Sequence, residues 1–305
     1  MPLLEKGNPL VLDLHPEPGH GPDRSPFAGR TAVLATKHGK ERVIAPAVGP
    51  GLGIDVIVPP DFDTDRFGTF TRDVPRSGSQ REAARAKANA ALDATGYGLA
   101  IASEGSFAPH PAVPWSTTNI ELVLLIDRVH DLEIVGSHVA AETVSGHRWV
   151  SGAVDALEFA QSIGFPDHGI IARRHPDDNH GIHKEIGDEA ALRDAVRDII
   201  HASADGRAFL EADLRAHRNP TRMTAIAAAA VDLVANANRR CPACHTPGFS
   251  LIDSEPGLPC RWCRMPTEYV RALIYGCLRC DERREMPRPD GRAFAEPGEC
   301  PFCNP

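Results

Sequence analysis

The chain has 305 residues, of which 24% are charged and 42% apolar, and its formal net charge is −8. This length can bury one large core or two smaller ones, and the composition excludes a collagen, a coiled coil and a wholly disordered chain. The segment from residue 239 onward carries about +1 and contains all eight cysteines, whereas the rest carries about −9. Neither part has the basic excess of a general nucleic-acid binder. We therefore expect the tail to be a separate unit.

The sequence predicts no association with a membrane. No apolar run approaches the roughly 20 residues needed to cross a bilayer. The first residues also lack the basic start and long apolar stretch of a signal peptide. We therefore expect a cytoplasmic protein. Residues 1–28 are rich in Pro, Gly and His and lack periodicity, so we expect them to form a flexible arm.

Strands and helices are expected to alternate over residues 29–238. Short apolar runs predict strands, and helical periodicity with capping residues predicts helices. The expected strands are 31–35, 54–58, 97–102, 120–126, 132–135 and 168–172, and the expected helices are 79–95, 154–163, 188–202 and 219–236. This alternation is typical of an α/β fold in which helices flank a mixed sheet.

The tail, residues 239–305, contains four Cys-x2-Cys pairs. Each pair places two thiolates on one tight turn, and two pairs complete a tetrahedral four-sulfur site that suits Zn²⁺. We therefore expect a zinc-ribbon module with two structural ions. Sequential pairing would give two ribbons in tandem, and interleaved pairing would give a cross-braced module; the spacing leaves both open. The expected ligands are Cys241, Cys244, Cys260, Cys263, Cys277, Cys280, Cys300 and Cys303.

Polar residues in the α/β segment suggest a second site. Thr36–Lys40, after the first strand, combines Gly with two Lys, which suits phosphate binding. Glu82 lies on the next helix, and Glu104 follows an apolar strand, where catalytic carboxylates are common. Together these carboxylates could hold Mg²⁺ against phosphate oxygens, and Arg72 in the polar loop 61–78 could grip the phosphates. The alternative is that Glu82 is a solvated helix residue and Glu104 a turn residue.

The order of these motifs resembles that of the inosine triphosphate pyrophosphatase superfamily. Residues 34–40 (LATKHGK) are similar to its LATxNxxK loop, although His38 replaces the Asn. Residues 82–88 (EAARAKA) are similar to its ENAxxKA helix, and 103–106 (SEGS) to its IEGG turn. Residues 164–171 resemble its aromatic-Gly loop, and 216–218 (AHR) its Ser-His-Arg. The whole chain also resembles a bacterial family of unassigned function with a Cys-rich tail.

The resemblance implies a fold, a reaction and a set of site residues. The reaction would be Mg²⁺-dependent hydrolysis of a nucleoside triphosphate, with a non-standard purine base, to monophosphate and pyrophosphate. Glu82 and Glu104 would bind Mg²⁺ or activate water, and Lys40 would contact the phosphates. The substrate-binding residues would be Thr36, Lys37, His38, Lys87, Arg72, His217 and Arg218, the last two near the base.

The resemblance also implies a homodimer. The alternative function is a non-catalytic nucleotide-sensing or docking protein, in which the zinc ribbons bind protein or nucleic acid.

Overall fold

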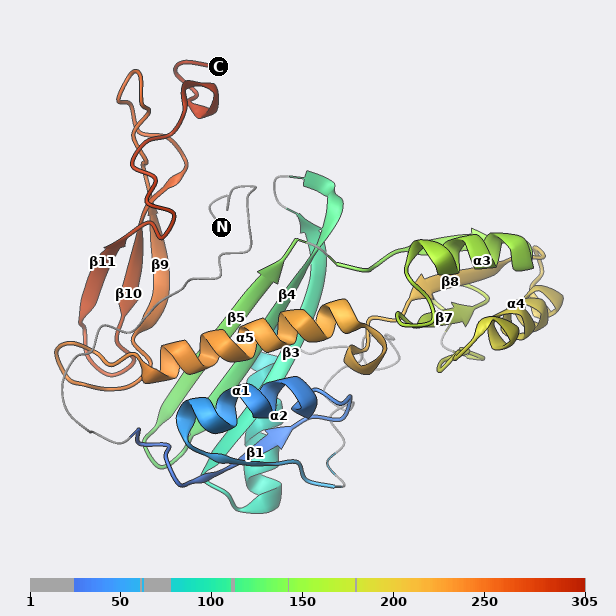
Figure 1. The fold of residues 1–305 in the computed structure, drawn as a ribbon, viewed down its shortest axis with the longest axis horizontal. Coiled ribbons are helices and arrows are strands. Elements are labelled where there is room, and N and C mark those ends of the chain that lie inside the picture. Colours follow the sequence, from blue (N-terminus) through green and yellow to red (C-terminus); the bar gives the residue numbers. More distant parts are fainter. Residues whose placement is uncertain are drawn as a thin grey trace.

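The computed structural model describes residues 25–60, 62, 78–110, 113–141, 143–178 and 180–304. Most of the expected N-terminal arm and Arg72 lie outside the described residues. Three parts are visible in Figure 1: a body built on the largest sheet, a second lobe that carries α3 and α4, and an elongated tail that ends at the C-terminus. None of the described helices is long and apolar enough to cross a bilayer.

The body contains a mixed five-stranded sheet, as the sequence predicts. Its order is β2-β1-β3-β4-β5, in which β1 is parallel to β2 and β3 while the later neighbours are antiparallel. The strands are β1 (Thr31–Ala35), β2 (Asp55–Ile57), β3 (Leu99–His110), β4 (Val113–Asp127) and β5 (Leu132–Ala140).

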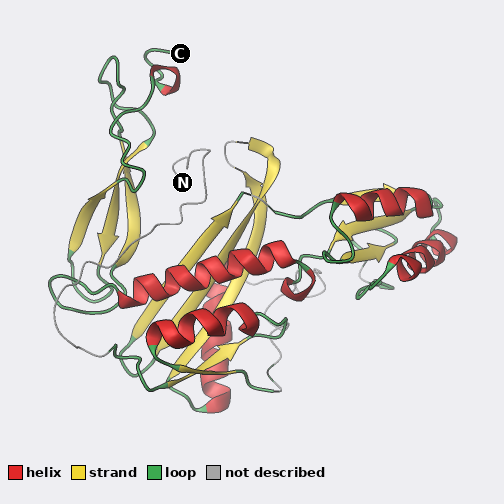
Figure 2. Ribbon diagram, viewed as in Figure 1, coloured by secondary structure: helices red, strands yellow, loops and turns green. Residues whose placement is uncertain are grey.

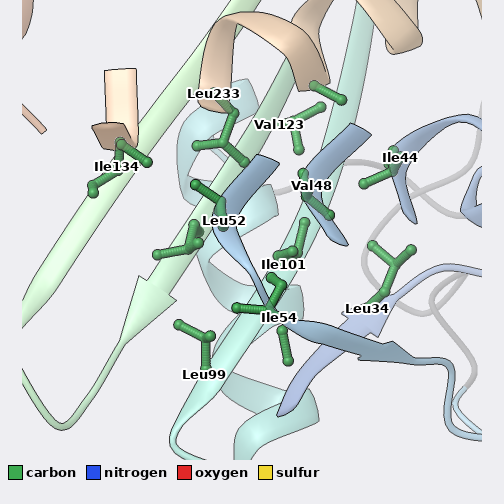
Figure 3. Packing of buried hydrophobic residues seen from close by; sticks show 14 of the residues in the cluster. Leu34, Ile44, Val48, Leu52, Ile54, Leu99, Ile101, Val123, Ile134 and Leu233 are labelled. Atoms are coloured by element: carbon green, nitrogen blue, oxygen red, sulfur yellow. The ribbon is translucent and has the colours of Figure 1, made fainter. Parts of the chain in front are cut away.

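Helices cover both faces of this sheet. They are α1 (Glu41–Leu52), α2 (Gln80–Thr95) and α5 (Pro220–Asn238). On one face, α1 and α5 bury a core with the sheet that includes Ile44, Leu233 and Val123 (Figure 3). On the other face, α2 packs through small residues, chiefly alanines, against the opposite side of β1, β3 and β4. The first two crossovers therefore lie on opposite faces.

Several elements differ from the sequence-based expectation, and two of them position the expected site. Helix α1 is not predicted, because it contains Pro46 and Pro50, which remove backbone donors. The buried face of α1, with Ile44, Val48 and Leu52, compensates by packing on the sheet. Strand β3 continues to His110 instead of ending at Ala102. Glu104 is thus a strand residue paired with Leu122 of β4, not a turn residue.

A second lobe with its own core is inserted between β5 and α5. Its three-stranded sheet has the order β6-β8-β7, and α3 and α4 bury one face of it. Its elements are β6 (His147–Val150), α3 (Ala153–Ser162), β7 (Ile170–Arg173), α4 (Glu189–Ala202) and β8 (Ala208–Ala212). A short 3₁₀ turn, Ala216–Arg218, then leads the chain back into α5.

The tail is a three-stranded antiparallel sheet with long loops at its ends (Figure 2). Its strands are β9 (Ser250–Pro256), β10 (Val270–Gly276) and β11 (Arg283–Pro287), in the order β11-β10-β9. A second 3₁₀ turn, Pro297–Glu299, precedes the last cysteine pair. The tail follows α5 directly.

The closest approach of α5 to the sheet occurs at Gly136 of β5. A Cβ at this position would collide with the backbone nitrogen of Leu233 and the backbone oxygen of Ala229. Backbone atoms cannot yield as a flexible side chain does. Gly136→Ala should therefore lower the free energy of unfolding by about 2 kcal/mol or more. Urea denaturation would measure this loss, and Gly187→Ala, which meets nothing within 4 Å, should be nearly neutral.

Candidate functional site

The eight cysteines form two four-sulfur clusters. One contains Cys241, Cys244, Cys277 and Cys280, and the other contains Cys260, Cys263, Cys300 and Cys303. In each cluster the ligand atoms lie within 4.8 Å of one another, and the closest pairs across knuckles are 3.5–3.9 Å apart. Tetrahedral Zn–S bonds of 2.3 Å require about 3.8 Å between sulfurs. None of the eight is in a disulfide, so both clusters fit zinc.

The pairing of the knuckles is interleaved, which is one of the two arrangements that the spacing allows. The reason is the antiparallel sheet between them. Strand β9 carries the chain from the first knuckle to the second, β10 carries it back to the third, and β11 leads out again toward the fourth. Odd knuckles therefore meet at one end of the sheet and even knuckles at the other. We call the odd cluster, next to α5, the proximal centre, and the even cluster the distal centre.

Both centres are built in the same way. After the second cysteine of a knuckle, His245 and Arg264 adopt left-handed backbone conformations, with φ of 59° and 61°. Backbone N–H groups of Trp262 and Arg279 donate to the sulfurs of Cys260 and Cys277 at 3.4 and 3.3 Å. Such donors favour the thiolate form that a metal requires. The pKa of Cys244 is lowered to about 6, chiefly by its hydrogen bond with Thr246.

Several polar residues of the body lie at the carboxyl end of β1, where the crossover connections change from one face of the main sheet to the other. The chain leaves β1 for α1 on one face and enters β3 from α2 on the other, so the carboxyl end of β1, beside Ala102, is a topological switch point. Ligands of open α/β sheets bind at such points. The expected phosphate loop begins here with Thr36, whose buried hydroxyl has no hydrogen-bond partner among the described residues.

Lys40 ends this loop and is buried on the α1 face. Its Nζ donates to Oγ of Ser103 at 3.0 Å. Burial, together with the positive charges of Arg222 and Lys87, lowers the pKa of Lys40 to about 7. The carboxylates of Glu121 and Glu104 oppose this shift. At neutral pH Lys40 is therefore only partly protonated.

Glu104 projects to the opposite face of β3, because successive strand residues alternate. There it forms a buried ion pair with Lys87 of α2. Gln80, seven residues before Lys87 on the same helix, donates to the backbone oxygens of Glu104 and Ile120 at 2.6 and 2.9 Å. These contacts fix the start of α2 on the middle of β3. Lys87 and Glu104, 17 positions apart in the sequence, are thus brought together.

Glu82 has a different environment from Glu104. It lies about 140° around α2 from Lys87 at 3.6 residues per turn. Its carboxylate accepts a hydrogen bond from the backbone N–H of Ser79, and the Ser79 hydroxyl accepts one from the N–H of Glu82. This capping box holds the pKa of Glu82 below its ordinary value. Helix capping thus accounts for Glu82 without a metal.

The second lobe brings further residues to the same loop. The ring of His217 stacks on His38, with centroids 5.1 Å apart and 15° between planes. Nε2 of His217 lies 3.4 Å from Glu185, which also pairs with Arg215 at 2.6 Å. Arg218 instead donates to the backbone oxygen of Ile186 at 2.6 Å. His217 therefore lies at the loop, whereas Arg218 holds the 183–187 segment. Lys37 is exposed in the loop itself.

One buried ion pair near Lys40 is not anticipated from the sequence. Arg222 of α5 donates to Glu121 of β4 at 2.7 Å, and both are almost fully buried. Gly105 passes so close that a Cβ there would meet both side chains. The available signal was a lone carboxylate in the apolar run 120–126. Three cations and two carboxylates, Lys40, Lys87, Arg222, Glu104 and Glu121, thus form one cluster, which favours an anionic ligand.

The described residues do not build the expected Mg²⁺ site. That ion usually needs one or two carboxylates that are open to it, together with substrate phosphates. Glu82 caps a helix, Glu104 is paired with Lys87, and Glu121 is paired with Arg222. In the part of the chain that is described, the only groups of three or more possible metal-ligating side chains are the two cysteine clusters.

The fold and sites define a mixed α/β protein with a cross-braced module suited to two zinc ions. The chain belongs to the family described as Domain of unknown function (DUF6671), which matches residues 87–305. This match runs without interruption from α2 through the zinc module. No curated protein matches the chain.

The interleaved pairing can be tested by zinc content. Cys244→Ser with Cys277→Ser removes two ligands from the proximal centre, so about one Zn²⁺ per chain should remain. Cys244→Ser with Cys263→Ser damages both centres and should leave about none after dialysis against a chelator. Atomic emission spectroscopy would measure the metal. Sequential pairing would give the opposite result for the two double variants.

Burial of Lys40 should appear as a pH dependence of stability. The pKa of Lys40 is about 7 in the folded chain and ordinarily 10.5. The unfolded chain therefore binds more protons between these values, and stability rises with pH. Relative to Lys40→Met, the free energy of unfolding of the wild type should rise by about 1 kcal/mol per pH unit above pH 7.5. Urea denaturation at several pH values would measure it. Exposed Lys37→Met is the control, because its difference in stability from the wild type should not vary with pH.

Proposed function

We propose that the protein hydrolyses a nucleoside triphosphate to monophosphate and pyrophosphate at the cluster around Lys40. One observation carries this proposal. The loop after β1, the pair Lys87 and Glu104, and His217 come from distant parts of the chain and meet at the switch point of the sheet. The resemblance assigns these same positions to phosphate binding, catalysis and base recognition.

The charges of the cluster support binding of phosphate groups. When Lys40 is protonated, Lys40, Lys87 and Arg222 outnumber the two carboxylates. The site also lies next to the start of α1, where the helix dipole favours anions. A phosphate that entered between Lys40 and Lys87 would restore the charge on Lys40. It would also compete with Glu104 for Lys87. Binding would thus release the one carboxylate that the reaction needs.

The chemistry follows from that release. Glu104 would accept a proton from a water molecule, and the water oxygen would attack the α-phosphorus. The bond from this phosphorus to the bridging oxygen would break, and pyrophosphate would leave with its new charge stabilised by the lysines. Since the described residues offer no two-carboxylate site, we propose that Mg²⁺ arrives as part of the substrate, as a magnesium–triphosphate complex.

Base recognition would involve the contact between the body and the second lobe. His38 and His217 already stack as two rings, and a purine ring stacks on such surfaces. Glu185 lies beside His217 and could accept a hydrogen bond from the N–H edge of a base. This arrangement is consistent with a purine nucleotide.

A second candidate function is nucleotide sensing without catalysis. The observation that favours it is that both expected catalytic carboxylates have partners, Glu82 in the capping box and Glu104 in the ion pair. If the ion pair persists when a nucleotide binds, no base is available to activate water. The protein would then bind the triphosphate and pass the signal to the zinc module.

Pyrophosphate release distinguishes the two functions. Purified protein would be incubated with standard and deaminated nucleoside triphosphates over a range of Mg²⁺ concentrations. We expect pyrophosphate from at least one triphosphate, and a loss of about 100-fold or more in Glu104→Gln. The matched variant Glu82→Gln should retain full activity, because Gln also completes a capping box.

Binding is measured in parallel by calorimetry. Triphosphate binding that weakens in Lys40→Met, with no pyrophosphate released by the wild type, would support the sensing function. Absence of both binding and release, in protein that retains its zinc, would contradict both functions. Equal loss of activity in Glu82→Gln and Glu104→Gln would contradict the distinct roles assigned to the two carboxylates.

A further inference from the structure

Exposed apolar side chains are concentrated on the zinc module. Among the described residues, thirteen large apolar side chains are exposed, and seven of them lie between 251 and 302. Those of the rest of the chain are valines and one tyrosine, whereas the module contributes larger groups. They are Leu251, Ile252, Trp262, Met265, Leu278, Met286 and Phe302. Such a concentration marks an interaction surface more often than chance exposure does.

The two centres differ in whether they contact the body. At the third position of their knuckles, the proximal centre has Ala243 and Arg279, and the distal centre has Trp262 and Phe302. Arg279 donates to the backbone oxygen of His130 at 2.7 Å, so the proximal centre is docked on the body. Trp262 and Phe302 of the distal centre are 78% and 61% exposed. The loops beyond this end of the tail sheet lie near the C-terminus (Figure 1). The two centres are thus built alike, and the proximal centre is the one that contacts the body.

The sheet between the centres adds apolar surface. Leu251 pairs with Tyr275, and Leu273 pairs with Met286, so these four side chains share one face. Leu251 and Met286 remain exposed on it. With Trp262 and Phe302 of the distal centre, these two exposed side chains present on the order of 500 Å², which is more than half of the roughly 800 Å² that each partner buries in a standard interface.

The charge of the module argues for a protein partner and against nucleic acid. Near the distal centre, Arg261 pairs with Glu296 at 3.0 Å, and Arg292 pairs with Glu299. The guanidinium of Arg264 lies 4.5 Å from the ring centroid of Phe294. These cations already have partners within the chain. A surface that binds phosphate backbones needs unneutralised positive charge, which the module, at about +1 in total, does not provide.

The distribution of charge along the chain also favours a second copy of this chain as the partner. The rest of the chain carries about −9, so two bodies repel each other, whereas two near-neutral modules meet without that cost. We propose that the module is a dimerisation element, in which the distal centre and apolar sheet face of one chain pack against those of a second copy, with Trp262 and Phe302 as anchors. Zinc holds both anchors rigidly, which lowers the entropic cost of association.

The test is the oligomeric state of the full, zinc-loaded chain. Sedimentation equilibrium would compare the wild type with the double variant Trp262→Ser, Phe302→Ser. We expect a wild-type dimer and a dissociation constant raised by about 100-fold or more in the variant. The matched control is Val154→Ser with Val231→Ser, which removes two similarly exposed apolar side chains outside the module and should leave the dimer intact.

Each other outcome overturns the proposal. A wild type that stays monomeric at all concentrations has no such interface. A dimer that persists in the Trp262 and Phe302 variant, which must retain its zinc, uses a different surface. Binding of a labelled single-stranded RNA of about 12 nucleotides by the monomer, lost in the same variant, would identify nucleic acid as the occupant instead.

Discussion

The close packing of α5 on the main sheet is the constraint on which the rest of the molecule depends. At Gly136 the helix backbone lies against the strand with no side chain between them. Small residues on α5, among them Ala229 and Ala230, make this approach possible. The two ends of α5 then position the other parts: its first turn carries Arg222 into the polar cluster, and its last turn leads directly into the proximal zinc centre (Figure 1). A change in the distance between α5 and the main sheet would therefore displace both the polar cluster and the proximal centre.

The polar cluster contains a lysine that is buried in the body. Lys40 is costly to bury, and its lowered pKa is the direct expression of that cost. The sheet creates the position, because its first two crossovers lie on opposite faces and leave the carboxyl end of β1 open between them. Ser103 and Glu104 then act on opposite faces of one strand, each with a lysine beside it. Lys40 and Lys87 therefore lie on opposite faces of β3. An anion at the end of β1 that contacted both lysines would bridge the two faces.

In the zinc module, the strand order determines how the cysteines pair. Its strands are short and its core is small, so zinc bound by the two cysteine clusters would supply much of its folding free energy. An antiparallel sheet with a knuckle at every turn sends alternate knuckles to opposite ends, and the interleaved pairing follows from that geometry alone. The proximal centre is bonded to the body through Arg279, and the module extends away from the body (Figure 2). Trp262 and Phe302 of the distal centre remain exposed.

Much of this could be predicted from local patterns. Capping residues such as Ser79 and Asn219 and apolar periodicity predicted α2, α5 and the mixed sheet, and the Cys-x2-Cys spacing predicted two metal centres, because these properties depend on neighbours in the chain. The Pro-containing α1 was missed, since its stability comes from the core that it covers. The different roles of Glu82 and Glu104, the ion pair of Glu121 with Arg222 and the pairing of the knuckles were decided by tertiary structure. Each depends on which face of a helix or strand a side chain occupies, and on which distant segment lies opposite it.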